Sequence, residues 1–438
     1  MPKTKGIKRV AILTSGGDSP GMNAAIRAVT RKAIYNGFKV VGIQRGYQGL
    51  LEEDFLDFDA RSVSDTIQRG GTILRTARSE EFKTEEGRKK GAEICRKHGI
   101  DAVVVIGGDG SYRGALTLSH EGIAVIGLPG TIDLDIACTD YTIGFDTAVN
   151  TALEAIDKIR DTSSSHERCS IVEVMGRNAG YIALWCGVAS GAEDILLPEK
   201  YNYDEQEIIN HIIESRKIGK THHLIINAEG IGHSTSMARR IEAATGMETR
   251  ATILGYMQRG GAPTCKDRYY ASIMGAMAVD LLAEGKTNRV IGHHDGEFMD
   301  FDIDEALAME KTISDFEENI IKVNLKEARN AVLQMKMKQA FMNPKQFLQT
   351  KTINTKDGLS FQVLDIKNIE DISDEDAITY LSGFQAVGRE GRIVYLPIDK
   401  QKVQSEILAL TKPEGDDKDG MEIETTAEII KGSLQVKT

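Results

Sequence analysis

The sequence predicts an α/β protein made of two similar doubly wound, Rossmann-like α/β domains. Apolar runs of strand length recur, and each is followed by a glycine-rich turn and then by a stretch with helical periodicity. Later strand-like runs at 170–176 and 223–230 again end in glycine or an acidic residue, which indicates a second α/β unit. This alternation is typical of parallel sheets with helices on both faces.

The first unit contains the clearest elements. RVAIL (9–13) predicts a strand, and TSGGDSPGMN (14–23) predicts a glycine-rich turn before a helix over 24–37. AVVVIGG (102–108) predicts a buried strand that is followed by a helix over 109–122. A further short strand, IAVIG, leads into LPGTIDLDI.

The stretch 145–161 predicts an amphipathic helix that leads out of the first unit. Its apolar side chains share one helical face: Ala148, Ala152, Ala155, Ile156 and Ile159. The segment DTSSSHER (161–168) is interpreted as the end of this helix and a polar loop.

After about Asn324 the character of the sequence changes. Residues 325–347 are Met-rich with a helical pattern, GRIVYLPI (391–398) is strand-like, and 412–426 is acidic and loop-like. We find no catalytic motif in this region, and its role is left open.

Composition narrows the classes of partner and compartment. The chain has 438 residues and a formal net charge of -11, which argues against nucleic acid or an anionic membrane as a partner. Its 5 cysteines are scattered and never in C-x-x-C spacing, so neither a disulfide framework nor a zinc site is indicated. With no signal peptide or membrane-length apolar run, a soluble, cytoplasmic protein is expected.

The stretch DAVVVIGGDGSY (101–112) places a lone carboxylate, Asp109, between glycines at the end of a strand. Asp109 either caps the following helix or holds the Mg²⁺ that accompanies phosphates at such a turn. Gly16 and Gly17 form a similar turn after the first strand, which is either a tight connection or a second phosphate cradle. The G-x-x-x-x-G-K-[ST] pattern of a P-loop is absent.

The segment PGTIDLD contains Asp133 and Asp135, two residues apart after a predicted strand. In an extended segment both carboxylates point to the same side. They are either solvated turn residues or a pair in which one removes a proton from a hydroxyl while the other helps to hold a metal. Arginines near glycine turns are candidate phosphate ligands or ordinary surface residues: Arg78, Arg168, Arg177, Arg250 and Arg259.

Several motifs, in order, resemble the ATP-dependent 6-phosphofructokinases of the bacterial type. The resemblance runs collinearly from about Arg9 to about Asn324. It rests on TSGGDSPGMNAAIR, VVIGGDGSYRGA, GLPGTIDLDI, TDYTIGFDTA, IRDTSSSHER, VEVMGRNAG and ETRATILGYMQRGGAP. A lone GGDG would be less specific, because other kinase families also contain it.

The resemblance implies a role for each matching residue. Asp133, with Thr131 beside it, would deprotonate the 1-hydroxyl of fructose 6-phosphate, Arg177 would stabilise the transferring phosphoryl group, and Asp109 and Asp135 would bind Mg²⁺. The ATP site would be lined by Gly17, Tyr47, Arg78, Gly108, Gly110, Ser111 and Gly114. The sugar phosphate would be contacted by Met175, Gly176, Arg177, Glu229, Tyr256 and Arg259, and by Arg168 and Arg250 from a neighbouring subunit.

The resemblance also implies how the chain is organised. Residues 1–144 plus 258–308 would bind ATP and Mg²⁺, 145–257 plus 309–326 would bind the sugar phosphate, and 327–438 would be an extension. Because two arginines would serve the neighbouring site, the protein would form a homodimer or homotetramer.

Three positions depart from the family pattern. Leu134 replaces the usual asparagine between the aspartates, Cys138 replaces glycine, and Tyr256 replaces histidine. The departures beside the aspartates leave open a catalytically weak regulatory sibling. A pyrophosphate-dependent phosphofructokinase is a second alternative. The pyrophosphate-dependent branch typically has aspartate and lysine where this chain has Gly110 and Gly130.

The resemblance further implies an allosteric phosphate site at the subunit boundary. The matching residues are Arg27, Arg31, Asp65, Arg160, Glu193 and Lys220. Ala60, Ile218 and Thr221 replace cations of the family pattern, and Arg61 replaces a tyrosine. A weakened response to the family's effectors, ADP and phosphoenolpyruvate, is expected.

Overall fold

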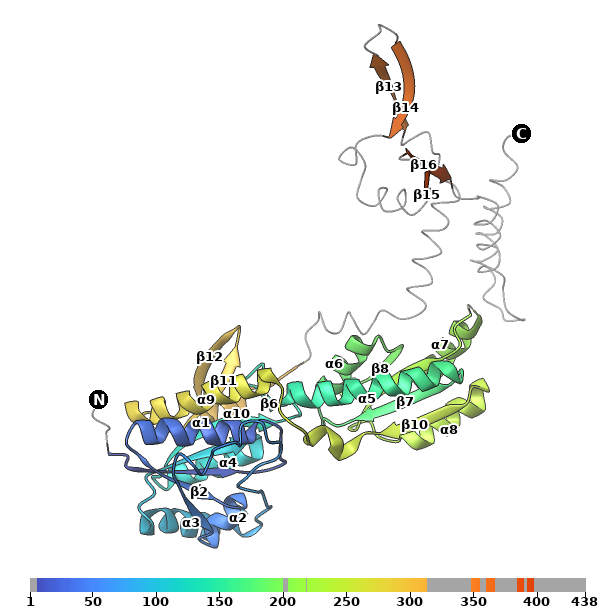
Figure 1. Ribbon diagram of the computed structural model, residues 1–438. Coiled ribbons are helices and arrows are strands. Elements are labelled where there is room, and N and C mark those ends of the chain that lie inside the picture. The colour runs from blue at the N-terminus through green and yellow to red at the C-terminus, as the bar shows by residue number, and fades with distance from the viewer. Residues whose placement is uncertain are drawn as a thin grey trace. The chain divides into compact units, whose positions relative to one another are not determined.

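The computed structural model describes residues 6–199, 204–217 and 219–312, and the backbone of four strands further along. The chain divides into two units, 1–323 and 324–438. The first unit contains two separate β-sheets, each covered by helices (Figure 1). This confirms the α/β fold class, whereas the domain boundaries expected above stay a prediction.

The first sheet has the strand order β12-β11-β5-β4-β1-β2-β3, with β6 paired to β5. Its central strands are parallel, and the edge strands β3 and β12 are antiparallel to their neighbours. The bounds are β1 (Arg9–Thr14), β2 (Lys39–Ile43), β3 (Phe55–Phe58), β4 (Ala102–Gly107), β5 (Ala124–Thr131), β6 (Ile143–Gly144), β11 (Arg289–His294) and β12 (Glu297–Asp302). The strand order reverses direction between β1 and β4, and such a switch point is where open α/β sheets bind ligands.

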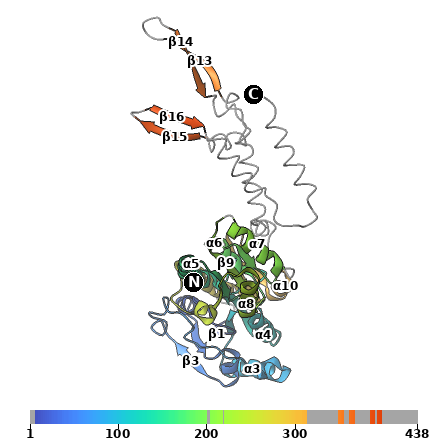
Figure 2. The same cartoon turned by 90° about the vertical axis from the view of Figure 1, so that its right-hand side faces the viewer.

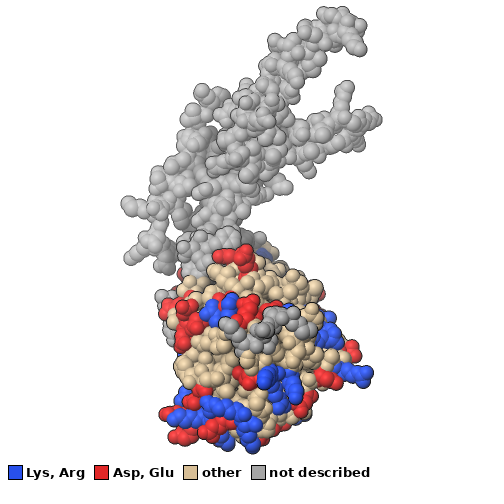
Figure 3. Space-filling view, turned by 90° about the vertical axis from the view of Figure 1, so that its left-hand side faces the viewer, with Lys and Arg blue, Asp and Glu red and all other residues tan. Residues whose placement is uncertain are grey.

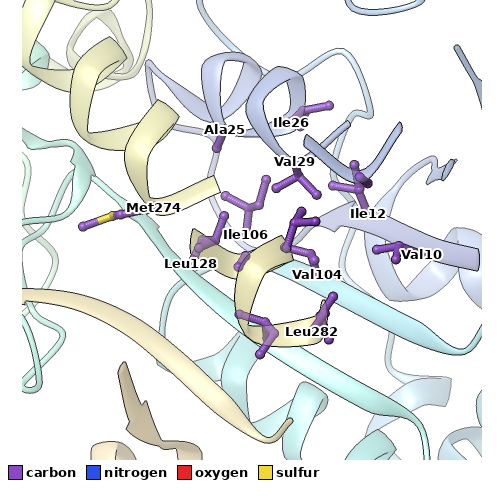
Figure 4. Close-up of a cluster of buried hydrophobic side chains, with 14 of the residues drawn as sticks. Val10, Ile12, Ala25, Ile26, Val29, Val104, Ile106, Leu128, Met274 and Leu282 are labelled. Atoms are coloured by element: carbon purple, nitrogen blue, oxygen red, sulfur yellow. The ribbon is translucent and has the colours of Figure 1, made fainter. Parts of the chain in front are cut away.

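Both faces of this sheet are buried, which explains the unbroken apolar run of β4. One face packs against α1 (Met22–Tyr35) and α9 (Cys265–Glu284), as Figure 4 shows for Ile26, Met274 and their neighbours. The other face packs against α2 (Gly46–Leu51), α3 (Glu85–Lys97), α4 (Asp109–His120) and α10 (Ile303–Ala308). Successive β4 residues such as Val103 and Val104 belong to opposite clusters, because side chains alternate along a strand.

The second sheet is parallel, with strand order β10-β7-β9-β8. Its strands are β7 (Cys169–Val174), β8 (Asp194–Leu196), β9 (His223–Ala228) and β10 (Thr249–Ile253). One face packs against α5 (Phe145–Ser165) and α6 (Tyr181–Ser190), and the other against α7 (Glu205–Lys217) and α8 (Ser234–Thr245). Short 3-10 helices are η1 (Glu81–Lys83) and η2 (Gly255–Arg259).

The helix predicted over 145–161 continues through Ser165. It therefore ends within the stretch 161–168, which was expected to contain its end and a polar loop. Ser163 is buried and pairs with the hydroxyl of Ser170, and Ser165 Oγ donates to Asp161 O at 2.9 Å. These serines find partners within the helix or beneath it, and the helix therefore does not need to end at the first of them.

A buried carboxylate joins the two sheets where the chain passes from one to the other. Asp267, at the start of α9, is fully buried and accepts hydrogen bonds from Tyr141 Oη at 2.6 Å and Gly144 N at 2.7 Å. It also accepts from Thr147 N at 2.9 Å, within the first turn of α5. Burial raises the pKa of Asp267, and these donors act in the opposite direction. Asp267 thus fixes the start of α5 against the first sheet.

The second unit is described only by its strands. β13 (Leu348–Asn354) pairs with β14 (Ser360–Ile366), and β15 (Phe384–Arg389) pairs with β16 (Arg392–Pro397), both antiparallel (Figure 2). The strand-like stretch at 391–398 is therefore confirmed by β16. The predicted helix over 325–347 and the acidic loop at 412–426 lie outside the described residues.

Charge is mixed over the face drawn in Figure 3, where acidic and basic side chains of the described residues are interspersed. Among the described helices, none combines the length and the apolar character that crossing a membrane requires.

Candidate functional site

The glycine-rich turns after β1 and β4 meet at the switch point of the first sheet. Ser111, in the first turn of α4, donates its hydroxyl to Ser15 O at 3.1 Å and so ties the two turns together. A Cβ atom added at Gly108 or Gly110 would meet nothing within 4 Å, so the space beside the N-terminus of α4 is open. Backbone N–H groups and the helix dipole favour an anion at such a position.

Tyr47 packs against this turn. Its hydroxyl donates to Ser111 O at 2.6 Å, and its ring stacks on Phe82 with centroids 4.2 Å apart. A Cβ atom at Gly114 would lie 2.7 Å from the Tyr47 ring, so glycine lets the tyrosine pack against α4. Phe82 was missed by the sequence analysis, because it occupies no motif. Arg78, by contrast, is exposed.

Three carboxylates gather beyond the ends of β4 and β5. Asp133 is buried, and burial together with the charge of Asp135 raises its pKa to about 6. Burial raises the pKa of Asp135, and burial followed by the charge of Asp135 raises that of Asp109. Clustered carboxylates whose charge raises a neighbour's pKa are a favourable site for a divalent cation, and their oxygens are the ligands Mg²⁺ prefers. Asp109 and Asp135 therefore fit the expected metal.

The carboxylate segment is not extended, and the argument that Asp133 and Asp135 share one side of a strand was wrong. Leu134 between them has φ 55°, in the left-handed region. Its side chain is buried in the core of the second sheet, together with Ile132. The two carboxylates are nevertheless near enough to raise the pKa of Asp133, because the chain turns between them.

The backbone of Asp133 is held by a hydrogen bond, whereas one oxygen of its carboxylate has no donor among the described residues. Its backbone N–H donates to Thr131 Oγ1 at 3.2 Å. Within the described part of the chain, its Oδ1 is buried and accepts no hydrogen bond. A carboxylate with a pKa near neutrality and an unused oxygen is suited to take a proton from a bound hydroxyl.

The second sheet contributes the residues that follow β7 and β9. Arg177 has φ 57°, and its N–H donates to Glu229 Oε1 at 2.5 Å, which joins the two strand ends. The charge of Arg177 acts to lower the pKa of Asp135, and that of Glu229 acts to raise the pKa of Asp133. The structure therefore brings residues from both sheets into electrostatic reach of the carboxylates.

Arg259, at the end of η2, contacts the first glycine turn. Its Nη1 donates to Asp18 O at 3.1 Å, and its guanidinium occupies the space that a Cβ atom at Gly17 would need. The charge of Arg259 acts to lower the pKa of Asp133. The neighbouring Gln258 is fully buried and accepts from Met175 N at 3.2 Å. Gln258 lies within the motif ETRATILGYMQRGGAP, but nothing in that motif distinguishes it as a buried acceptor.

Gly176 follows Met175 and has φ 142°. A Cβ atom there would overlap the backbone oxygen of Ala179, so the turn that leads into Arg177 requires glycine.

Arg168 and Arg250 are not brought to the carboxylates of their own chain. Arg168 precedes β7 whereas Arg177 follows it, and the 6 residues of that strand span about 20 Å. Both arginines instead pair with Glu248, at 2.7 Å from Arg168 Nε and 2.9 Å from Arg250 Nε. Tyr256 is 82% exposed. In a single chain Arg250 is thus exposed like Tyr256, whereas Arg168 is half-buried.

The two substitutions beside the carboxylates leave the charged groups in place. Cys138 is buried in the core of the first sheet, and burial raises the pKa of its thiol to about 11. Leu134 packs into the other core.

Gly110 and Gly130, where the pyrophosphate-dependent branch typically has aspartate and lysine, differ in their surroundings. Gly110 borders open space, so an aspartate there would fill room that a nucleotide could use. Gly130 is buried in β5, and a Cβ atom there would lie 2.8 Å from Ile106 Cγ2. Gly110 therefore borders space that a bound nucleotide could use, whereas core packing explains Gly130.

Open glycine turns that face clustered carboxylates and arginines define an α/β phosphotransferase type of site. Comparison with known proteins identifies the family: Phosphofructokinase matches residues 9–282, more than half of the chain. The protein belongs to the phosphofructokinase family.

Named relatives and solved structures agree with this. The chain is 59% identical over 306 residues to an ATP-dependent 6-phosphofructokinase of Clostridium botulinum, which covers 70% of this chain and 96% of that protein. It is 58% identical over 309 residues to ATP-dependent 6-phosphofructokinase 1 of Clostridium perfringens, with coverage of 70% and 97%. The phosphofructokinase structure from Saccharomyces cerevisiae superposes with a TM-score of 0.66 at 30% identity, covering 77% of this chain but 50% of the yeast chain. A pyrophosphate-dependent phosphofructokinase from Marinobacter aquaeolei shares the fold, with a TM-score of 0.64 at 22% identity over 70% of this chain and 86% of that one.

Proposed function

We propose that this protein transfers the γ-phosphoryl group of ATP to the 1-hydroxyl of fructose 6-phosphate, giving fructose 1,6-bisphosphate and ADP. The observation that carries the proposal is Asp133, a buried carboxyl group with a pKa raised to about 6 and an Oδ1 that accepts no hydrogen bond from the described residues. A base of this pKa is largely ionised at neutral pH and can accept the proton of a hydroxyl nucleophile. The relatives named ATP-dependent 6-phosphofructokinase support ATP as the donor.

The remaining residues take roles that follow from their positions. The first turn of α4 and the Gly17 turn hold the ATP phosphates, with Gly108 and Gly110 at the open edge and the buried Ser111 beside them. Asp109 and Asp135 hold Mg²⁺, which when bound neutralises charge on the transferring phosphoryl group. Arg177 binds the phosphoryl oxygens. Thr131 keeps Asp133 oriented, because its hydroxyl oxygen accepts the hydrogen bond from the backbone N–H of Asp133.

Sugar-phosphate binding requires a second copy of the chain in this proposal. Met175, Gly176, Glu229 and Arg259 bind the sugar phosphate within one subunit. Arg168 and Arg250, which lie a strand length from Arg177, reach the 6-phosphate of a neighbouring subunit, with Tyr256 at the same boundary. We therefore infer a homodimer or homotetramer. The free cysteines among the described residues are compatible with the reducing cytoplasm in which we expect the enzyme to act.

The donor is tested with the purified full chain, fructose 6-phosphate and Mg²⁺, supplying either ATP or pyrophosphate. We expect turnover with ATP and little with pyrophosphate, and the reverse result would contradict the proposal. Turnover with neither donor would favour a regulatory sibling.

A variant at the open glycine sharpens this test. Gly110→Asp should fold, because a Cβ atom there meets nothing within 4 Å. Its carboxylate would oppose the ATP phosphates, so the KM for ATP should rise about tenfold or more, the effect of roughly 1.4 kcal/mol. His120→Asp adds the same charge at the exposed far end of α4 and should leave this KM unchanged. Equal KM values in both variants would show that ATP does not approach Gly110.

A further inference from the structure

Lys311 follows α10 and reaches back to the carboxylate segment. Its Nζ donates to Thr139 O at 2.6 Å and lies 3.4 Å from Ile136 O. These carbonyls stand on either side of the turn at residues 137–138, which begins two residues after Asp135. One ammonium group thus holds both ends of the turn that follows the carboxylate pair.

The same ammonium contacts the second sheet. Nζ lies 5.2 Å from the centroid of the Tyr181 ring, within the range of a cation–π interaction. Tyr181 is buried and is the first residue of α6, four positions after Arg177. Lys311 therefore touches the segment that follows Asp135 and the segment that follows Arg177.

The surroundings of Lys311 distinguish it from an ordinary surface lysine. Lys311 is half-buried, whereas the side chain of Lys286, in the loop between α9 and β11, is 53% exposed. Backbone carbonyls and an aromatic face hold the ammonium group of a lysine in a defined position. That charge also acts to lower the pKa of Asp135, so the ammonium lies within electrostatic reach of the carboxylates.

We propose that Lys311 is a positioning residue for phosphoryl transfer, because its ammonium group links the turn after Asp135 to the helix that follows Arg177. The role rests on the proposed function, in which the carboxylates and Arg177 must act on the same transferring group. Positioning supplies most of the catalysis in phosphoryl transfer, and a displacement of about 1 Å can cost about 10²-fold in rate. No motif singled out Lys311, since its contacts are with residues more than a hundred positions away.

The test compares Lys311→Met, Lys311→Arg and the control Lys286→Met in the full chain. Methionine keeps the aliphatic packing and removes the charge and donors. We expect kcat of Lys311→Met to fall about 10- to 100-fold, with KM for ATP within about threefold of wild type. Lys311→Arg, which keeps a cation and donors, should recover most of kcat, and Lys286→Met should match wild type.

Hydrogen exchange provides a readout that does not depend on activity. In Lys311→Met the amides of residues 134–139 should exchange faster than in wild type, because the turn has lost its contacts with the ammonium group. A kcat above a third of wild type would overturn the proposal. A reduced kcat with unchanged exchange would also overturn it, since the ammonium would then act on substrate directly. If Lys311→Met does not fold, Lys311→Gln is judged by the same criteria.

The two proposals fail differently in this design. An inactive wild-type protein would contradict the proposed kinase function, whereas the exchange comparison would still decide whether Lys311 holds the turn.

Discussion

Asp133 and Asp135 lie on either side of a left-handed residue, and burial together with the charge of Asp135 raises the pKa of Asp133 to about 6. An ordinary aspartate has a pKa of about 3.9. The base is therefore ionised at neutral pH and becomes protonated within a range in which activity can be measured.

The pH dependence of activity follows from this shift. Below pH of about 6, protonated Asp133 has no charge with which to accept the substrate proton, so kcat/KM for fructose 6-phosphate should fall tenfold per pH unit. In Asp135→Asn the neighbouring charge is lost, the pKa of Asp133 falls, and the acidic limb of the residual activity should move to lower pH. The profile is measured between pH 5 and pH 8, as roughly the range that brackets the shifted pKa. A limb at the same pH in wild type and Asp135→Asn would contradict the coupling.

Asp133→Asn should nearly abolish turnover and leave substrate binding close to wild type. Loss of a positioned base costs on the order of 10²–10⁴-fold in rate, and the amide has the shape of the carboxyl group. Its backbone hydrogen bond to Thr131 is unaffected by the change. Asp140→Asn, an exposed residue in the same segment, serves as the control in steady-state assays and in titrations of fructose 6-phosphate. More than a tenth of wild-type turnover in Asp133→Asn would show that another group is the base.

Leu134→Asn should lower the thermal midpoint less than Leu134→Ala. Both changes lose the burial of a leucine, which is worth roughly 1.5–3 kcal/mol. Asparagine regains part of this because it adopts positive φ more readily than leucine, for which the left-handed conformation costs roughly 1–2 kcal/mol. Alanine regains little, since it also has a Cβ atom. Neither change alters a charged group, so kcat should stay within about threefold of wild type. Equal midpoints, or a lower one for asparagine, would argue against strain at φ 55°.

Tyr256→His should lower the concentration of fructose 6-phosphate that gives half-maximal rate. An imidazolium gives a charge-assisted hydrogen bond where the phenol gives a neutral one, a gain of roughly 1 kcal/mol, or about fivefold. Tyr256 is 82% exposed, so the change removes no core packing. The assay is best run near pH 6.5, about the pKa of an unperturbed histidine. Tyr269→His, at a position 58% exposed on α9, should have no effect. An unchanged or raised value for Tyr256→His would remove this residue from the phosphate site.

The enzyme should respond little to ADP or phosphoenolpyruvate at millimolar concentration. Cations retained in the expected effector site already have partners: Lys220 pairs with Glu193, and Arg160 Nη2 donates to Gly191 O at 3.1 Å. Ala60 and Thr221, which replace cations, are exposed, and Ile218 lies outside the described residues. Each lost charge-assisted bond is worth roughly 1.5–3 kcal/mol, so affinity should fall more than tenfold.

Both effectors are titrated against initial rate at subsaturating fructose 6-phosphate. Sigmoidal inhibition by phosphoenolpyruvate that ADP reverses and Arg160→Ala removes would show that the site still operates.

The sequence by itself determined the α/β class, the strands that end in glycine turns and the chemistry of the turn residues. These features are local: an apolar run such as Val103–Ile106 must be buried on both faces, and parallel strand ends must meet at one edge. The motif order also carried the resemblance from which Asp109, Asp133 and Arg177 were assigned. The sequence placed the end of the helix from Phe145 only within 161–168, because the partner of Ser163 becomes a neighbour only after folding.

Tertiary structure decided the features that depend on distant parts of the chain. The left-handed turn at Leu134 follows from cores on either side of the carboxylate segment, since Leu134 packs into one core and Cys138 into the other. The raised pKa of Asp133 requires burial and charges from both sheets, and Lys311 contacts carbonyls more than a hundred residues away. Burial, electrostatic interaction and hydrogen bonding depend on distances in space. Between residues far apart in the sequence, these distances are set only when the chain folds.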